Sequence, residues 1–89
     1  MAEFLYTIVE EHYFRLQLRK IKRDAKRAEE FLEGAKWILS RAPDAGMKVA
    51  DDVWFLPNDV PGDVPVNLYY TFDEDHVYLL RIEIAGNKP

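Results

Sequence analysis

The fold of this 89-residue chain is decided by residues 64–84, which read VPVNLYYTFDEDHVYLLRIEI. In the first half of this stretch, apolar side chains alternate with polar ones, the pattern of a strand with one buried face. The side chains expected to point inward are Val64, Val66, Leu68, Tyr70 and Phe72. A short acidic turn at residues 73–75 leads into a second apolar run, so the stretch predicts an antiparallel β-hairpin.

Two helices are predicted before this hairpin. Apolar residues recur there at steps of four and three, on one helical face: Phe14, Leu18, Ile21, Ala25, Ala28, Leu32, Ala35 and Leu39. One unbroken helix of about 30 residues would be about 45 Å long, which exceeds the width of so small a domain. We therefore predict a break near Arg23 and Asp24, with Asp24 capping the second helix, and thus a helical hairpin. Pro43 and Gly46 predict its end near Arg41.

Shorter strands are predicted on both sides of the helices. Residues 4–9 are almost all aromatic or β-branched, and Val53–Leu56 is typical of a short buried strand. Residues 57–63, rich in Pro, Gly, Asn and Asp, predict an exposed loop, and residues 85–89 a frayed end. The predicted fold class is α+β, in the order β-α-α-β-β-β, with the helical hairpin packed on a largely antiparallel sheet. We expect residues 1–89 to form a single domain.

Composition excludes several kinds of protein and of site. The chain has no stretch of about 20 apolar residues and no secretory signal pattern, so we expect a cytoplasmic protein without a membrane partner. It has no Cys, which excludes disulfides, thiolate metal sites and thiol nucleophiles. His12 and His76 are the only imidazoles, and the acidic turn lacks the spacing of a calcium loop. We therefore expect no metal site and no cofactor.

The formal net charge of −4 is the sum of two oppositely charged regions. Residues 15–27 carry a net charge of +6 and the rest of the chain −10. The bases of this segment are Arg15, Arg19, Lys20, Lys22, Arg23, Lys26 and Arg27. Such a run is usually a solvated helix face, whose long side chains cover apolar surface. The alternative is a docking surface for an anionic or acidic partner, which makes these seven the candidate binding residues.

The predicted order of elements, together with local sequence patterns, resembles the RelE/ParE superfamily of bacterial toxins from toxin–antitoxin pairs. The patterns are the strand Tyr6–Val9, the helical run Ala28–Leu32, the helix-ending segment Pro43–Gly46, and the hairpin segments Asn67–Phe72 and Val77–Ile82. The resemblance implies a helical hairpin lying against a curved antiparallel sheet. It also implies a cognate antitoxin that wraps the protein with an extended or helical segment.

Members that resemble RelE cleave messenger RNA on the ribosome, and members that resemble ParE poison DNA gyrase. Where relatives usually carry an Arg in the hairpin, this sequence has Asn67, and no Tyr follows Arg81. Residues 51–89 carry a net charge of −6, which repels a nucleic-acid backbone. We therefore expect no direct nucleic-acid binding and no catalysis. Should the chain be a nuclease, its candidate catalytic residues are Arg81, Tyr69 and His76, followed by Lys48 and Tyr70.

The sequence thus leads to one main functional prediction and two alternatives. The main prediction is a toxin-family protein of a type II toxin–antitoxin system, which binds a gyrase or ribosome target and is neutralised by its antitoxin. The first alternative is a non-toxic protein-interaction module on the same fold. The second alternative is a ribosome-dependent mRNA endonuclease.

Overall fold

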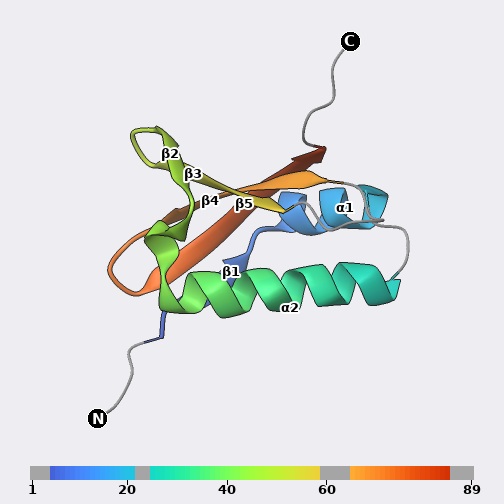
Figure 1. The fold of residues 1–89 in the computed structure, drawn as a ribbon, viewed down its shortest axis with the longest axis horizontal. Helices are drawn as coiled ribbons and strands as arrows, with labels where there is room; N and C mark the ends of the chain where they lie inside the picture. The colour runs from blue at the N-terminus through green and yellow to red at the C-terminus, as the bar shows by residue number, and fades with distance from the viewer. Residues whose placement is uncertain (1–4, 22–24, 59–64, 85–89) are drawn as a thin grey trace.

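The chain folds as a five-stranded sheet with two helices on one of its faces (Figure 1). The computed structural model describes residues 5–21, 25–58 and 65–84. The helices are α1 (His12–Ile21) and α2 (Ala25–Arg41), followed by the 3-10 helix η1 (Pro43–Ala45). The strands are β1 (Thr7–Glu10), β2 (Met47–Ala50), β3 (Val53–Asn58), β4 (Val66–Phe72) and β5 (His76–Ile84).

The strands lie in the order β1-β5-β4-β3-β2. Strands β2 to β5 form an antiparallel meander, and β1 pairs in parallel with β5 at the other edge. The predicted α+β fold with a largely antiparallel sheet is therefore confirmed. The sheet has one strand more than the sequence predicted, because β2 forms a hairpin with β3 across the turn at Asp51 and Asp52.

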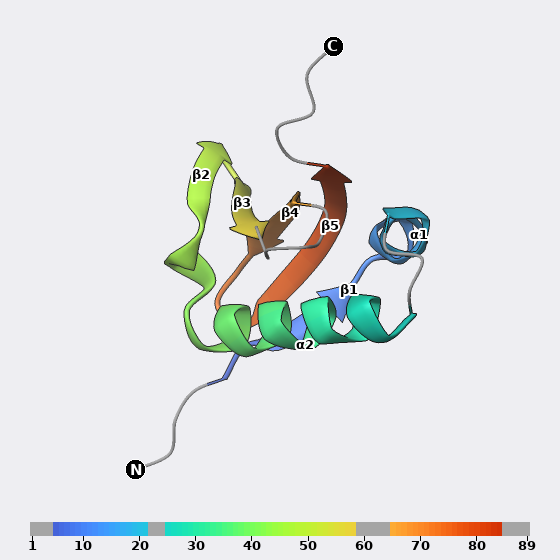
Figure 2. The ribbon, with the colours of Figure 1, turned by 45° about the vertical axis from the view of Figure 1, so that its right-hand side comes forward.

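The predicted break between the helices is also confirmed. Helix α1 ends at Ile21 and α2 begins at Ala25, while the proposed cap Asp24 lies outside the described residues. The two helices are not parallel: in Figure 2, α1 is seen nearly end-on while α2 runs across the view. Helix α1 contacts β5 far more than it contacts α2, so the sheet holds it in place more than the other helix does.

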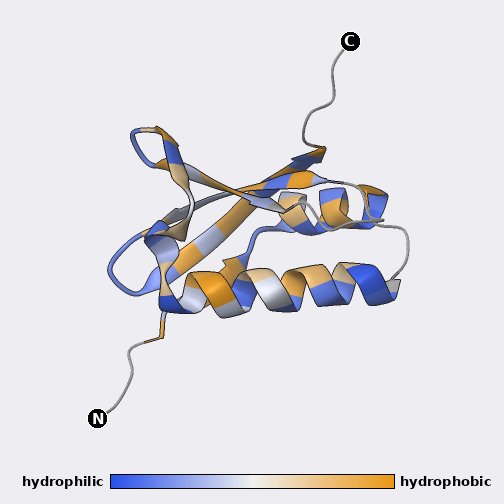
Figure 3. Ribbon diagram, viewed as in Figure 1, coloured by the Kyte–Doolittle hydropathy of each residue, from blue (hydrophilic) through white to orange (hydrophobic). Residues whose placement is uncertain are grey.

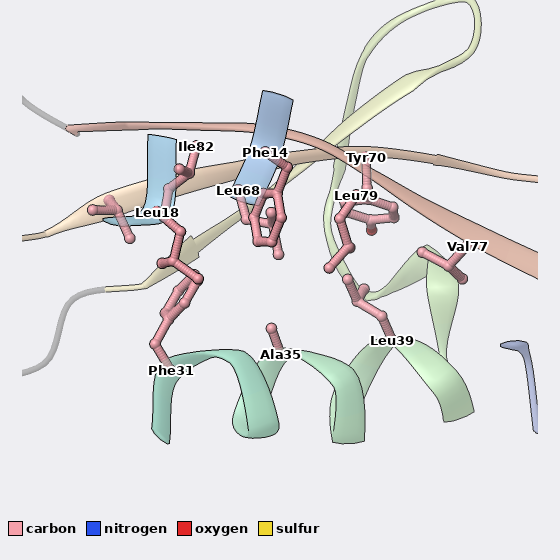
Figure 4. Packing of buried hydrophobic residues seen from close by; sticks show 11 residues of the cluster. Phe14, Leu18, Phe31, Ala35, Leu39, Leu68, Tyr70, Val77, Leu79 and Ile82 are labelled. Atoms are coloured by element: carbon pink, nitrogen blue, oxygen red, sulfur yellow. The ribbon is translucent and has the colours of Figure 1, made fainter. Parts of the chain in front are cut away.

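A single apolar core fills the space between the helices and the sheet (Figure 4). Both helices are amphipathic, with hydrophobic and hydrophilic bands alternating along them (Figure 3). The buried side chains are Phe14, Leu18, Phe31, Ala35, Leu39, Val66, Leu68, Tyr70, Val77, Leu79 and Ile82. The predicted inward positions of β4 are thus confirmed for Val66, Leu68 and Tyr70, and Phe72 packs against this core while Val64 lies outside the described residues.

An irregularity in β5 sets which side chains share the outer face of the sheet. Tyr69 pairs with Arg81 and Tyr70 with Leu79, so Leu80 is an extra residue in β5. The buried residues Leu79 and Ile82 are consequently three positions apart instead of two. The Ile82 amide donates to the side-chain oxygen of Gln17 on α1, at 3.1 Å, which ties the helix to this part of the strand.

Some predicted boundaries were wrong. Strand β3 continues through Pro57 and Asn58, where a loop was expected, because these residues pair with Asn67 and Val66 of β4. The remainder of the predicted loop and the predicted frayed end lie outside the described residues. Strand β1 begins at Thr7, later than expected. Among the described residues, no helix combines the length and the hydropathy needed to cross a membrane.

Candidate functional site

The outer face of the sheet, opposite the helices, carries a row of side chains from four neighbouring strands. The register aligns Met47 of β2 with Phe55 of β3, Phe55 with Tyr69 of β4, and Tyr69 with Arg81 of β5. The Phe55 and Tyr69 rings lie 6.0 Å apart between centroids, and the Arg81 guanidinium lies 4.9 Å from the Tyr69 ring centroid. Met47 is 55% exposed. We call these four residues the outer-face row.

Two of the three candidate catalytic residues lie together in this row. Arg81 stacks on Tyr69, and its Nη2 atom lies 3.0 Å from a carboxylate oxygen of Glu83, so its charge is already paired within the sheet. His76 begins β5, five residues before Arg81, which separates the two by about 16 Å along the strand. The structure therefore does not bring the imidazole next to the Arg81–Tyr69 pair, and its acid–base chemistry is not available there.

His76 belongs instead to the turn between β4 and β5. Its Nδ1 atom lies 2.6 Å from Oδ1 of Asp75, and its backbone amide donates to Oδ1 of Asp73 at 2.8 Å. The pKa of the Asp73 carboxyl is held below its ordinary value, mainly because the Asp75 and His76 amides donate to it. The Tyr78 hydroxyl donates to the other Asp73 oxygen at 3.3 Å.

The sequence did not indicate that this turn gathers possible metal ligands. Asp73, Asp75 and His76 each offer a ligand atom, and these atoms lie within 4.8 Å of one another. Oδ1 of Asp73 already accepts hydrogen bonds from two amides of the turn, however, Oδ1 of Asp75 lies 2.6 Å from the His76 ring, and both carboxylates are exposed. This geometry is that of an Asp-stabilised hairpin turn, and the residues serve to fix where β5 begins.

Two further candidates occupy very different surroundings. Lys48 is exposed on β2 and pairs in register with Trp54. Tyr70 is fully buried, and its hydroxyl donates to the Pro43 carbonyl at 2.6 Å and accepts from the Gly46 amide at 3.1 Å. Burial raises the pKa of this phenol. This hydroxyl holds the connection between α2 and β2 and is buried, which does not favour a catalytic role for Tyr70.

The predicted binding residues spread over the exposed sides of both helices. The described ones are Arg15, Arg19, Lys20, Lys26 and Arg27, which we call the basic helix surface. Lys22 and Arg23 lie outside the described residues. Glu10 at the end of β1 lies 3.7 Å from Arg15 and 2.6 Å from Lys36 of α2, so part of this charge is balanced locally.

Comparison with solved structures identifies the fold. A chain of the toxin–antitoxin complex RelBE2 from Mycobacterium tuberculosis superposes with a TM-score of 0.74, covering 97% of this chain and 98% of that one, at 21% sequence identity. At this identity the likeness establishes the fold alone, so the predicted arrangement of two helices on a largely antiparallel sheet is shared with a chain of that complex. Searches of family models and of curated proteins by sequence find no match.

The outer-face row was missed by the sequence analysis for two reasons. Met47 lies on the strand that was not predicted, and Phe55 was assigned to a buried strand without a face. The relative register of β4 and β5 was also open, because the extra residue Leu80 leaves no mark on the pattern of the sequence. Phe55 is a half-buried aromatic between two inward residues, Trp54 and Leu56, and this alternation is the signal that could have pointed to the outer face.

Proposed function

We propose that this protein is the toxin-family member of a toxin–antitoxin pair, which acts by binding a gyrase or ribosome target and is neutralised by a cognate antitoxin. The observation that carries the proposal is the likeness to a chain of the RelBE2 complex over nearly the full length of both chains. A fold alone does not define a function, so the proposal also needs a surface suited to such partners.

The outer face of the sheet supports binding of a polypeptide more than binding of a polynucleotide. The outer-face row offers apolar and aromatic area, and its single cation, Arg81, is paired with Glu83. A nucleic-acid backbone needs several uncompensated cations, whereas protein interfaces are built around aromatic and Met side chains with few charges. Strand β2 carries a second exposed apolar side chain, Val49, two residues after Met47 at the edge of the sheet.

The basic helix surface supports the proposal that the antitoxin binds through an acidic segment. Its side chains are exposed, and clustered cations of this kind attract an oppositely charged partner over about 8 Å at physiological salt. Such attraction raises the rate of association more than the final affinity. The antitoxin we propose therefore combines an acidic segment for the helices with apolar residues for the outer face of the sheet.

The test is induction of the protein in a bacterial host, with and without the product of a small open reading frame found next to its gene. We expect growth arrest on induction, relief by co-expression, and purification of the two proteins as one complex. Loss of plasmid supercoiling in the arrested cells would identify gyrase as the target, and loss of translation the ribosome. Normal growth together with no complex would refute the proposal.

A non-toxic interaction module is the second candidate function. It is favoured by the geometry of the nuclease candidates, because Arg81 is paired with Glu83 and His76 lies far from both Arg81 and Tyr69. A stable complex with the adjoining gene product, without growth arrest, would identify this function. Ribosome-dependent mRNA cleavage that is lost in Arg81→Ala but kept in the neighbouring variant Glu83→Gln would instead establish the endonuclease.

A further inference from the structure

The outward face of α2 has the pattern of a helical seam that lacks its partner. Its exposed residues Glu30, Gly34, Trp37 and Arg41 are spaced by four, three and four, which is the spacing of residues that face a second helix. They lie opposite the inward residues of α2, which Figure 4 shows pointing toward the sheet. Trp37 is 62% exposed, more than any other large hydrophobic side chain of the described residues.

Gly34 is the least expected residue of this seam. An exposed Gly within a helix costs about 1 kcal/mol relative to Ala. A Cβ atom built at Gly34 would meet no atom within 4 Å, so nothing in the protein itself requires a residue without a side chain. A missing side chain next to an exposed Trp leaves a recess in the helix surface that another large side chain can fill.

The seam is complementary to itself when two copies are placed antiparallel. We place the twofold axis between residues 35 and 36 of the two helices. Each residue of one copy then lies opposite the residue of the other copy at the same distance on the far side of the axis, so the two residue numbers add up to 71. Trp37 of each copy then lies opposite Gly34 of the other, and Arg41 of each lies opposite Glu30 of the other. One symmetry operation thus places a large side chain on a recess and a cation against a carboxylate, each of them twice.

In the single chain, Trp37 and Arg41 already lie in positions that this dimer would use. The Arg41 guanidinium stacks on the Trp37 ring, 4.3 Å from its centroid, and donates to the Trp37 carbonyl at 3.0 Å. The Trp ring is therefore held on the helix surface before any partner arrives, which lowers the entropic cost of binding. Ile38, which is 39% exposed, extends the apolar area beside it.

We propose that the outward face of α2 is a self-association surface, on which two copies of this chain pair through antiparallel α2 helices. The inference does not rest on the proposed function. A second copy is favoured over an unrelated partner because the recess, the large side chain and both charges of the pair lie in one short helix at positions that a single twofold axis superposes. A seam of one helix pair is a small interface, so the dimer is in exchange with the monomer.

The test is sedimentation of the full chain at protein concentrations from about 1 µM to about 1 mM. We expect the mass to rise from the 10.5 kDa of the monomer toward twice that value. Gly34→Leu fills the recess with a side chain whose Cβ atom meets no other atom of the monomer within 4 Å, and we expect it to raise the dissociation constant at least about tenfold. Its retained helical circular dichroism would show that the monomer still folds.

A charge exchange makes the test specific for this geometry. Glu30→Arg and Arg41→Glu each place like charges opposite one another twice, so we expect each to weaken the dimer about tenfold. The double variant restores opposite charges and should dimerise more tightly than either single variant. Glu29→Arg, the same charge change at an exposed position away from the seam, is the matched control and should leave the dimer unchanged.

Three results would overturn the proposal. The first is a monomer at every concentration. The second is a dimer that Gly34→Leu leaves unchanged, which would place the contact elsewhere, for example at the edge strand β2. The third is a double charge variant that dimerises no more tightly than the tighter of the two single variants, which would rule out the antiparallel register.

Discussion

At the scale of single residues, the Tyr70 hydroxyl has a structural role that no sequence pattern indicated. It connects β4 to the Pro43 carbonyl, at the first residue of η1, and to the Gly46 amide, directly after its last residue. Tyr70→Phe keeps the ring in the core but leaves these two groups without their partner, and a buried group that loses its partner costs about 1–3 kcal/mol. We expect that loss in the free energy of unfolding, measured with urea. Tyr13→Phe, at an exposed phenol, is the control.

The same phenol makes stability depend on pH in the alkaline range. Its pKa in the folded protein is raised above the ordinary value of 10.0, mainly by burial, so the folded state keeps its proton where the unfolded state loses it. This contribution is complete below about pH 10 and is lost as the pH rises toward the folded pKa. Tyr70→Phe should therefore lose less stability than the wild type above that pH. An equal loss in both proteins would contradict this assignment.

Two glycines should respond in opposite ways to the same substitution. Gly34 lies within α2 with open space around its Cβ direction, so Gly34→Ala should stabilise the protein by about 0.5–1 kcal/mol through helix propensity. At Gly46 a Cβ would collide with the Phe55 carbonyl oxygen and lie 2.7 Å from the Tyr70 hydroxyl, so Gly46→Ala should destabilise it. Thermal unfolding of dilute protein measures both, and a loss of stability in Gly34→Ala would contradict the prediction.

At the scale of elements, the turn between β4 and β5 depends on one carboxylate. Asp73 accepts hydrogen bonds from two backbone amides, which lowers its folded pKa below 3.8. Because the Asp73 pKa is lower in the folded protein than in the unfolded chain, the ionised carboxylate stabilises the protein at pH values above the pKa of the unfolded chain. This stabilisation is lost as the pH falls through the pKa of the folded protein. We expect Asp73→Ala to destabilise the protein at neutral pH and to reduce the acid dependence of unfolding, followed by circular dichroism. Glu74→Ala, in the same turn, is the control.

The elements that the sequence predicted well are those whose pattern is set by the core. The step of four and three in the helices and the alternation in β4 both record which side chains face the sheet, so the helix break and the β4–β5 hairpin were found. Strand β2 has all four residues exposed and therefore carries no such record. Its existence depends on hydrogen bonding to β3, which single-sequence patterns do not register.

The candidate site was less predictable than the fold because it depends on register. The sequence named Tyr69 and Arg81 separately, but only the extra residue Leu80 places Arg81 beside Tyr69 while Tyr78 still faces the same side. A shift of one residue would have reversed the outer and inner sets of β5. The ion pair between Arg81 and Glu83 was not predicted either, because it forms only when both side chains lie on the outer face of β5.

At the scale of the whole molecule, positive and negative charge occupy different parts of the chain. The bases of the basic helix surface lie on α1 and α2, while residues 51–89 carry a net charge of −6. We expect Arg19→Glu with Lys20→Glu to slow association with an acidic antitoxin at least about tenfold at low salt, and little at about 0.5 M salt. Stopped-flow measurements test this, with Lys48→Glu on β2 as the control. An unchanged rate would mean that the surface is only solvated.

The parallel pairing of β1 with β5 affects how the protein is made. Thr7 of β1 lies beside His76 of β5. During synthesis, β1 therefore cannot pair until some seventy further residues have been added. Helix α1 waits as well, since it packs on β5, and short helices are marginal in water on their own. In a nascent chain that stops before residue 76, β1 and α1 therefore lack the strand on which they pack, and we expect such fragments to be sensitive to proteases.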